Sequence, residues 1–249
     1  MKQTKLIMGM PIIVEIPGIQ NVDNLLTEVF DYFTSIDNKY STYKEASEIS
    51  KINNGLQKEL WSQEMKEIFE LCEQTKQETA GFFDILRPDG KYDPSGLAKG
   101  WAIQNATSIL HRHNIANFYI EAGGDIQVHG LSSKKQPWRI GIRNPFNTGE
   151  IIKTITLSNE GIATSGSYIR GQHIYNPLKP SSIIKNVKSI TVIGPNIYDA
   201  DRFATAAFAM DDKGVMFIES LPGFEAYMID KDKIATYTSG FKKYEAKDV

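Results

Sequence analysis

The chain has 249 residues, of which 28 are basic and 30 acidic, so its formal net charge is -2 at pH 7. Apolar residues make up 41% and charged residues 23%, a balance typical of soluble globular proteins that excludes disordered and fibrous classes. No block of basic residues stands out, which argues against nucleic acid as a partner. The length suits one domain over residues 1–249, or two intimately packed α/β subdomains.

The N-terminal segment shares some features with a signal peptide, because two lysines precede an apolar stretch from Leu6 to Val14. However, Gly9 and Pro11 interrupt that stretch, and no small-residue cleavage pattern follows it. No other segment approaches the roughly 18 to 20 apolar residues of a membrane span. We therefore expect a strand here, no membrane anchor in this chain, and a cytoplasmic protein.

Apolar residues at helical spacing predict three helices in the first half of the chain. The first covers residues 21–39, the second starts at Ser62 as N-cap and stops at Gly81, and the third covers residues 97–110. The second contains the chain's single cysteine, Cys72. One cysteine excludes a disulfide framework and a thiolate metal site within the chain, and we expect it to be buried and inert.

The rest of the chain predicts β-strands and two more helices. Residues 41–55 form a polar connector with a turn at Asn53-Asn54-Gly55. Seven short β-rich runs follow residue 116, separated by turn residues: NFYIEA, DIQVHG, WRIGIRNP, IIKTITLS, GIATSG, SITVIG and FEAYMID, with KIATYTSG as a last strand. DADRFATAAFAM and KGVMFIESLPG are helical. Helices and strands come in blocks, which favours an α+β fold with an antiparallel sheet and packed helices.

The segment DADRFATAAF places Asp201 and Thr205 four residues apart, on one face of a helix. A carboxylate and a hydroxyl together suit a hard cation such as Mg²⁺. An aspartate in the first turn of a helix is also a common cap or dipole partner, so spacing alone leaves both interpretations open.

Two glycine-containing segments are candidate ligand sites. In GLAKG, Lys99 lies in the first turn of a helix, where backbone N–H groups attract phosphate, or it is a solvated lysine at a plain loop-to-helix junction. In EAGGD, Gly123 and Gly124 form a hairpin turn or a loop against which a nucleotide lies. The stretch GIATSGSYIRGQHIYNP adds small hydroxyl residues and His173, a candidate proton carrier.

The order of these segments resembles the ApbE family of FAD:protein FMN transferases. LIMGMPIIVEI, STYKEASEISKIN, GLAKGWAIQNA, EAGGDIQVHG, GIATSGSYIRGQHIYNP, SITVIG and DADRFATAAF follow one another as the family's motifs do, over about residues 6 to 230. The resemblance implies an ApbE-like, T-fold-related α+β core. It also implies a Mg²⁺-dependent enzyme that transfers FMN from FAD, through a phosphoester bond, to a Thr or Ser hydroxyl of a partner flavoprotein and releases AMP.

The resemblance also assigns roles to individual residues. Catalytic roles fall on Lys99 and on His173, which would take the proton of the acceptor hydroxyl. The metal ligands would be Asp201, Thr205 and the Ala98 carbonyl. The FAD-binding residues that it implies are Met8, Tyr43, Ala122, Gly123, Gly124, Asp125 and Thr164.

The sequence departs from the family pattern at a few positions. Gln104 stands where an acid is common, Met10 replaces a threonine, Ser95 replaces a glycine, and Asn176 in HIYNPLKPSS replaces an aspartate. The segment between FFDI and GLAKG is also short. Two further hypotheses therefore stay open: an FAD pyrophosphatase that yields FMN and AMP, and a non-catalytic FAD-binding module.

Overall fold

The computed structural model describes residues 1–167 and 174–247. Its helices and strands have the following bounds: β1 Lys2–Ile7, β2 Met10–Glu15, α1 Asp23–Tyr40, α2 Glu48–Asn53, α3 Gln63–Glu78, α4 Ser95–Arg112, β3 Phe118–Ala122, β4 Asp125–His129, β5 Trp138–Asn144, β6 Asn147–Leu157, β7 Gly161–Gly166, β8 Val187–Gly194, α5 Ile197–Ala209, α6 Gly214–Glu219, β9 Glu225–Asp230 and β10 Ala235–Tyr237. Helices and strands are thus mixed without strict alternation.

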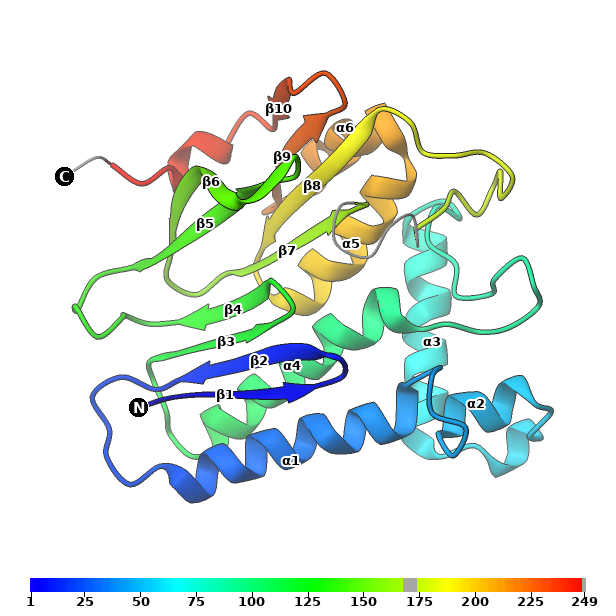
Figure 1. Cartoon of the computed structure of the whole chain (residues 1–249), viewed down its shortest axis with the longest axis horizontal. Helices are drawn as coiled ribbons and strands as arrows, with labels where there is room; N and C mark the ends of the chain where they lie inside the picture. The colour runs from blue at the N-terminus through cyan, green and yellow to red at the C-terminus, as the bar shows by residue number, and fades with distance from the viewer. Residues whose placement is uncertain (168–173, 248–249) are drawn as a thin grey trace.

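Eight strands form one sheet in the order β1-β2-β3-β4-β7-β8-β9-β10, and each pair of neighbours is antiparallel. The strands β5 and β6 form a separate antiparallel pair. In Figure 1 the long helices α1, α4 and α5 run along the sheet, and α4 contacts both of the others. The prediction of an α+β fold with an antiparallel sheet is confirmed.

The two faces of the sheet bury two different apolar clusters, as the alternation of side chains along β9 shows. Ala226 and Met228 belong to the cluster under the helices, whereas Tyr227 and Ile229 belong to the cluster under β5 and β6. Successive strand residues point to opposite faces. The helices α1, α4 and α5 therefore cover one side of the sheet, and β5 and β6 cover the other side over β4, β7, β8 and β9.

The N-terminal apolar stretch folds differently from the prediction of one strand. It forms the hairpin β1-β2, whose turn places Met8 at φ 57° and Gly9 at φ 69°. Two consecutive residues with positive φ are typical of the type I′ turn that joins twisted antiparallel strands. The sequence carries only a weak signal for this turn, because apolar residues continue on both sides of it.

The polar connector also contains an element that the prediction missed, the short helix α2. Its N-cap Ser47 accepts a hydrogen bond from the Ser50 N–H, and its apolar residues Ile49 and Ile52 are buried. Ser62 caps α3 as predicted, accepting from the Met65 N–H at 3.2 Å. Capping of this kind satisfies N–H groups that the first helical turn leaves without partners.

Two further expectations concern the single cysteine and a membrane-spanning segment. Cys72 is buried on α3, and burial raises the pKa of its thiol, as expected for an inert cysteine. Among residues 1–167 and 174–247, no helix is both long enough and apolar enough to cross a membrane.

Candidate functional site

The strand β4 carries polar side chains on the face that meets the helices. Ile126 and Val128 point into the cluster beneath β5 and β6, so Asp125 and Gln127 alternate with them toward α4 and α5. Both polar residues are at least 95% buried, at 1% and 5% exposure. Buried polar groups require partners, and these two find theirs at the helix starts and on β7.

Gln127 fixes the start of α5. Its Oε1 accepts from the Ile197 N–H at 2.8 Å, and the N-cap Asn196 accepts from the Asp199 N–H at 2.9 Å. Gly161 of β7 permits this approach, because a Cβ at that position would lie 2.2 Å from the Ile197 nitrogen. The first turn of α5 is therefore held against the sheet, and its orientation sets the position of Asp201.

Close packing of α4 on α5 brings Asp201 into the site. The Gly100 N–H donates to Asp201 Oδ2 at 2.8 Å. A Cβ on Gly100 would lie 2.7 Å from the Asp201 Cβ and 2.8 Å from the Ile197 carbonyl oxygen. Only glycine fits there without displacing a helix.

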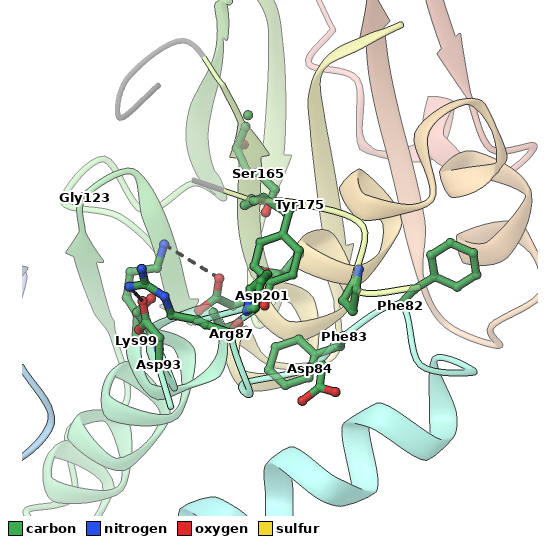
Figure 2. A pocket seen from close by; sticks show the side chains of 18 of the residues that line it. Phe82, Phe83, Asp84, Arg87, Asp93, Lys99, Gly123, Ser165, Tyr175 and Asp201 are labelled. Atoms are coloured by element: carbon green, nitrogen blue, oxygen red, sulfur yellow. Dashed lines mark hydrogen bonds and ion pairs between the residues drawn. The ribbon is translucent and has the colours of Figure 1, made fainter. Parts of the chain in front are cut away.

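Lys99 joins two buried carboxylates. Its Nζ forms an ion pair with Asp125 Oδ2 and lies 3.7 Å from Asp201 Oδ1, an interaction that Figure 2 marks with a dashed line. Asp125 Oδ1 in turn accepts from the Thr164 N–H at 3.1 Å, which ties β4 to β7. We call Lys99, Asp125 and Asp201 the acid-lysine cluster.

The cluster contains two carboxyl groups and one ammonium group. Burial raises the pKa of the Asp201 carboxyl above its ordinary value, and the nearby Asp125 carboxylate raises it further, although Lys99 and the Gly100 N–H act in the opposite direction. Two carboxylates share one ammonium group in a region with little solvent. An added cation would stabilise this arrangement.

The acid-lysine cluster lies at the floor of a cavity of about 420 Å³. The rim comes from the segment after α3, from the tip of the β3-β4 hairpin, from β7 and from residues 174–177. The lining residues are Tyr43, Phe82, Phe83, Asp84, Arg87, Pro88, Asp93, Ser95, Gly96, Lys99, Gly123, Thr164, Ser165, Gly166, Ile174, Tyr175, Pro177, Asp201 and Thr205. Figure 2 shows how side chains from these separate segments surround one space.

The rim segment from Phe82 to Arg87 is held by polar contacts. Asp84 forms an ion pair with Lys76 of α3 at 2.7 Å, and the Tyr175 hydroxyl donates to the Leu86 carbonyl at 3.2 Å. The contact through Tyr175 joins two walls of the cavity that are 89 residues apart in the chain. Phe82 and Phe83 add apolar surface, so the cavity combines aromatic walls with a charged floor.

The structure brings most of the predicted site residues together. Of the predicted residues that it describes, six line the cavity: Tyr43, Lys99, Gly123, Thr164, Asp201 and Thr205. Asp125 lies directly behind Lys99 in the acid-lysine cluster. The turn residues Gly123 and Gly124 have φ 60° and 99°, so the paired glycines form a hairpin turn whose first member also borders the cavity.

Other predicted residues are not part of the cavity lining. Met8 packs against the core from the β1-β2 turn, while the side chains of Ala98 and Ala122 are buried. A Cβ on Gly123 would lie 2.7 Å from Met10 Sδ, so Met10 is the methionine in contact with that turn. The predicted base His173 lies outside the described residues.

Two of the positions that depart from the family pattern are also placed. Gln104 lies on α4, and its Oε1 is buried without a hydrogen-bond partner within the described residues. Asn176 Oδ1 accepts from the Leu178 N–H at 2.9 Å, so its side chain stabilises a turn. Neither residue lines the cavity, although Tyr175 and Pro177 beside Asn176 do.

Sequence reasoning missed the rim segment after α3. Phe82, Phe83, Asp84 and Arg87 received no role from the sequence, yet all four line the cavity. A usable signal was present, because Gly81 ends the helix at φ 82° and two aromatic residues and an acid follow directly. Aromatic side chains in a loop are stabilised when they pack against other apolar groups, and a bound ligand supplies such groups.

Within residues 1–167 and 174–247, no group of three or more His, Cys, Asp or Glu side chains could hold a metal ion. The predicted metal site is of another kind, with one carboxylate, one hydroxyl and one backbone carbonyl. Asp201 and Thr205 both line the cavity, and Thr205 Oγ1 donates to the Gly96 carbonyl at 3.2 Å. The two buried carboxyl groups of the acid-lysine cluster are compatible with a hard cation that completes its ligands with water and phosphate.

A scan against family models matches the ApbE family over residues 8–89 and 86–228. Among curated proteins, the FAD:protein FMN transferase of Haemophilus influenzae is 30% identical over 169 residues, which is 63% of this chain and 49% of that protein. The enzyme of the same name from Vibrio cholerae is 31% identical over 166 residues, or 63% of this chain and 48% of the relative. The matched part of the chain thus spans about half the length of these curated relatives.

Solved structures share the fold. The flavin transferase ApbE from Vibrio cholerae superimposes with a TM-score of 0.85 at 24% identity and covers 98% of both chains. The ApbE protein from Thermotoga maritima gives a TM-score of 0.85 at 22% identity and covers 99% of both chains. The chain therefore shares the overall fold of these two proteins.

Proposed function

The chain belongs to the ApbE family, and on this premise we propose that it is an FAD:protein FMN transferase. It transfers FMN from FAD to a Thr or Ser hydroxyl of a partner flavoprotein and releases AMP. The hydroxyl oxygen forms a bond to the FMN phosphorus, and the bond from that phosphorus to the AMP oxygen breaks. The hydroxyl proton passes to a base. For this base the sequence offers His173, which is outside the described residues.

The observation that carries the proposal is the acid-lysine cluster at the floor of an aromatic-walled cavity. Phosphoryl transfer requires positioning and charge neutralisation more than covalent chemistry by the protein. Lys99 provides a fixed positive charge, and Asp125 and Asp201 hold its ammonium group in place. Tyr43 and Phe82 offer surfaces against which flat rings pack.

Mg²⁺ is part of the proposal. Asp201, Thr205 and the Ala98 carbonyl would hold it, and bound Mg²⁺ would neutralise charge on the pyrophosphate oxygens. The chain's own residues prepare that place: the Gly100 N–H fixes one oxygen of Asp201, and Gly96 orients the Thr205 hydroxyl. The cytoplasmic location expected from the sequence stays a prediction.

The test is incubation of the purified chain with FAD and Mg²⁺, with and without an acceptor flavoprotein domain that carries a flavinylation threonine. The acceptor's mass and free AMP are followed together. A mass gain equal to one FMN residue, lost in Asp201→Ala, supports the transferase. AMP without a mass gain favours the FAD pyrophosphatase, and intact FAD throughout favours the binding module.

A further inference from the structure

A second cavity of about 310 Å³ opens beside the first and shares two lining residues with it, Tyr43 and Arg87. Part of its lining comes from the motif STYKEASEISKIN, but Tyr43 is the one lining residue to which the resemblance assigns a role. Tyr43 is 97% exposed, so its side chain stands free at the boundary between the two spaces. The residues around the second cavity are Thr42, Tyr43, Glu45, Ser50, Asn53, Asn54, Arg87, Asp89, Lys91 and Tyr92.

The walls of this second cavity are fixed by hydrogen bonds. The Asn53 Nδ2 donates to the Tyr92 carbonyl at 2.9 Å, and the Tyr92 N–H donates to Asn53 Oδ1 at 2.7 Å. The opposite wall is a tight hairpin in which the Arg87 N–H donates to the Lys91 carbonyl at 2.8 Å. The Asn53 side-chain amide thus makes both hydrogen bonds of the Tyr92 backbone, as a neighbouring strand would, and joins α2 to this hairpin. These bonds fix the groove between the two elements.

The chemistry of the groove is polar and balanced. Two acids and two bases line it, and of these Arg87 and Asp89 form an ion pair at 3.1 Å. Glu45 and Lys91 take part in no ion pair within residues 1–167 and 174–247. One free charge of each sign, with hydroxyl and amide groups between them, suits the alternating donors and acceptors of an extended peptide.

We propose that the second cavity binds the polypeptide segment of the acceptor protein that carries the modified hydroxyl. The inference rests on the proposed function, which requires a protein acceptor to approach the first cavity, and the second cavity shares Tyr43 and Arg87 with it. Because the two cavities share these lining residues, a peptide seated in the groove lies directly beside the first cavity. FAD occupies the first cavity and the acceptor approaches through the second, with Arg87 at the boundary of both.

A blocking label tests this arrangement, because the chain offers a clean background for thiol chemistry. Cys72 is buried with a raised thiol pKa, so a cysteine introduced on the surface is the residue that a maleimide modifies. Asn54 is an exposed residue of the second cavity and does not line the first. Asn54→Cys carrying a bulky maleimide fills the groove, and the unlabelled variant is its reference.

Labelling of Asn54→Cys should lower the rate of FMN transfer to the acceptor domain by at least about tenfold, while FAD affinity stays unchanged. FAD affinity is measured by flavin fluorescence without acceptor. Lys134→Cys, exposed in the turn between β4 and β5, is labelled in parallel and should transfer FMN at the unlabelled rate. Circular dichroism verifies that both labelled proteins are folded.

The outcomes separate this inference from the proposed function. Undiminished transfer by labelled Asn54→Cys, with normal transfer by the unmodified protein, overturns the groove assignment and leaves the transferase intact. Loss of FAD affinity on labelling also overturns it, because the donor then occupies the groove. If the unmodified protein releases AMP but never labels an acceptor, the proposed function fails and the groove assignment fails with it.

Discussion

The floor and the rim of the first cavity hold their charges in different ways. At the floor, Lys99 is 17% exposed and its partners Asp125 and Asp201 are almost completely buried. At the rim, Arg87 forms an ion pair with Asp89, which lies outside the lining of the first cavity, and both side chains are 46% exposed. Buried charges without partners are costly, whereas exposed pairs contribute little to stability. Substitutions of the charged residues at the floor should therefore be costly, whereas substitutions of those at the rim should change stability little.

The largest expected effect comes from removing the carboxylate at the floor. Asp201→Ala should lower FMN transfer by at least about 100-fold, because the cavity loses the group that faces both Lys99 and the proposed cation. The measurement is acceptor mass and AMP release at saturating FAD. Asp232→Ala, which removes a carboxylate with 62% side-chain exposure, is the matched control and should leave the rate unchanged. Equal rates for both variants would contradict a catalytic role of the floor.

A smaller loss, now in stability, should follow from adding one methyl group between the helices. Gly100→Ala places a Cβ 2.7 Å from the Asp201 Cβ, so α4 and α5 must separate. We expect the free energy of unfolding to fall by about 1 to 3 kcal/mol. Urea denaturation checks this against Gly149→Ala, where the nearest atom would lie 3.7 Å away and the change should stay within about 0.5 kcal/mol. Similar midpoints for the two variants would show that the helices tolerate the added carbon.

The raised pKa of Asp201 at the floor should also appear as a pH dependence of stability. The pKa of Asp201 is raised above its ordinary 3.8, so the folded state keeps this proton to higher pH than the unfolded chain does. Its contribution to stability is complete below 3.8 and is lost as pH rises through the raised pKa.

We expect the free energy of unfolding, measured without divalent cations, to fall with pH in that window by at most about 1.4 kcal/mol per unit. Asp201→Asn carries no titrating group there, so its profile should be flatter. If the free energy of unfolding of the wild-type protein instead rises with pH over this window, and that of Asp201→Asn rises in parallel, other titrating groups cause the pH dependence.

The smallest effect belongs to the rim. Tyr43→Ala removes a ring that is 97% exposed, so the free energy of unfolding should change by less than about 0.5 kcal/mol. FAD affinity should fall roughly 2- to 13-fold, which corresponds to the loss of about 0.5 to 1.5 kcal/mol of ring packing. Tyr43→Phe retains the ring and should bind FAD as the native protein does. Flavin fluorescence titration measures both variants, and equal affinity of all three proteins would exclude ring packing.

The sequence could predict the elements whose apolar pattern is long and regular. The helices α1, α3 and α4 were found because one face of each is buried, and Ser62 marked the start of α3. The helix α2 was missed because two buried isoleucines in six residues give too short a pattern. The β1-β2 turn was missed because apolar residues flank it on both sides.

Because sequence patterns report mainly on local structure, only part of the site could be predicted from the sequence. Motif resemblance assigned Lys99, Asp125 and Asp201 to one site, but nothing local indicates that Lys99 contacts two carboxylates, one of them 102 residues away in the chain. That contact depends on the path of the chain across the sheet and on the small volume of Gly100. The aromatic residues after Gly81 were a usable signal for the rim segment from Phe82 to Arg87, but its contact with Tyr175, 89 residues from Leu86, depends on the folded chain.

The order in which the chain is synthesised gives the pairing of Gly100 with Asp201 a further meaning. These residues are separated by 101 positions. In the same way, β2 can pair with β3, its second neighbour in the sheet, only after about one hundred more residues have been synthesised. Contacts between distant parts of a chain form slowly, because the intervening loop must close first. A nascent chain therefore contains the α1 and α3 segments long before the floor of its cavity can form. Under the proposed function, FAD binding can begin only after α5 has been synthesised and packed, so bound FAD would report on a late event of folding.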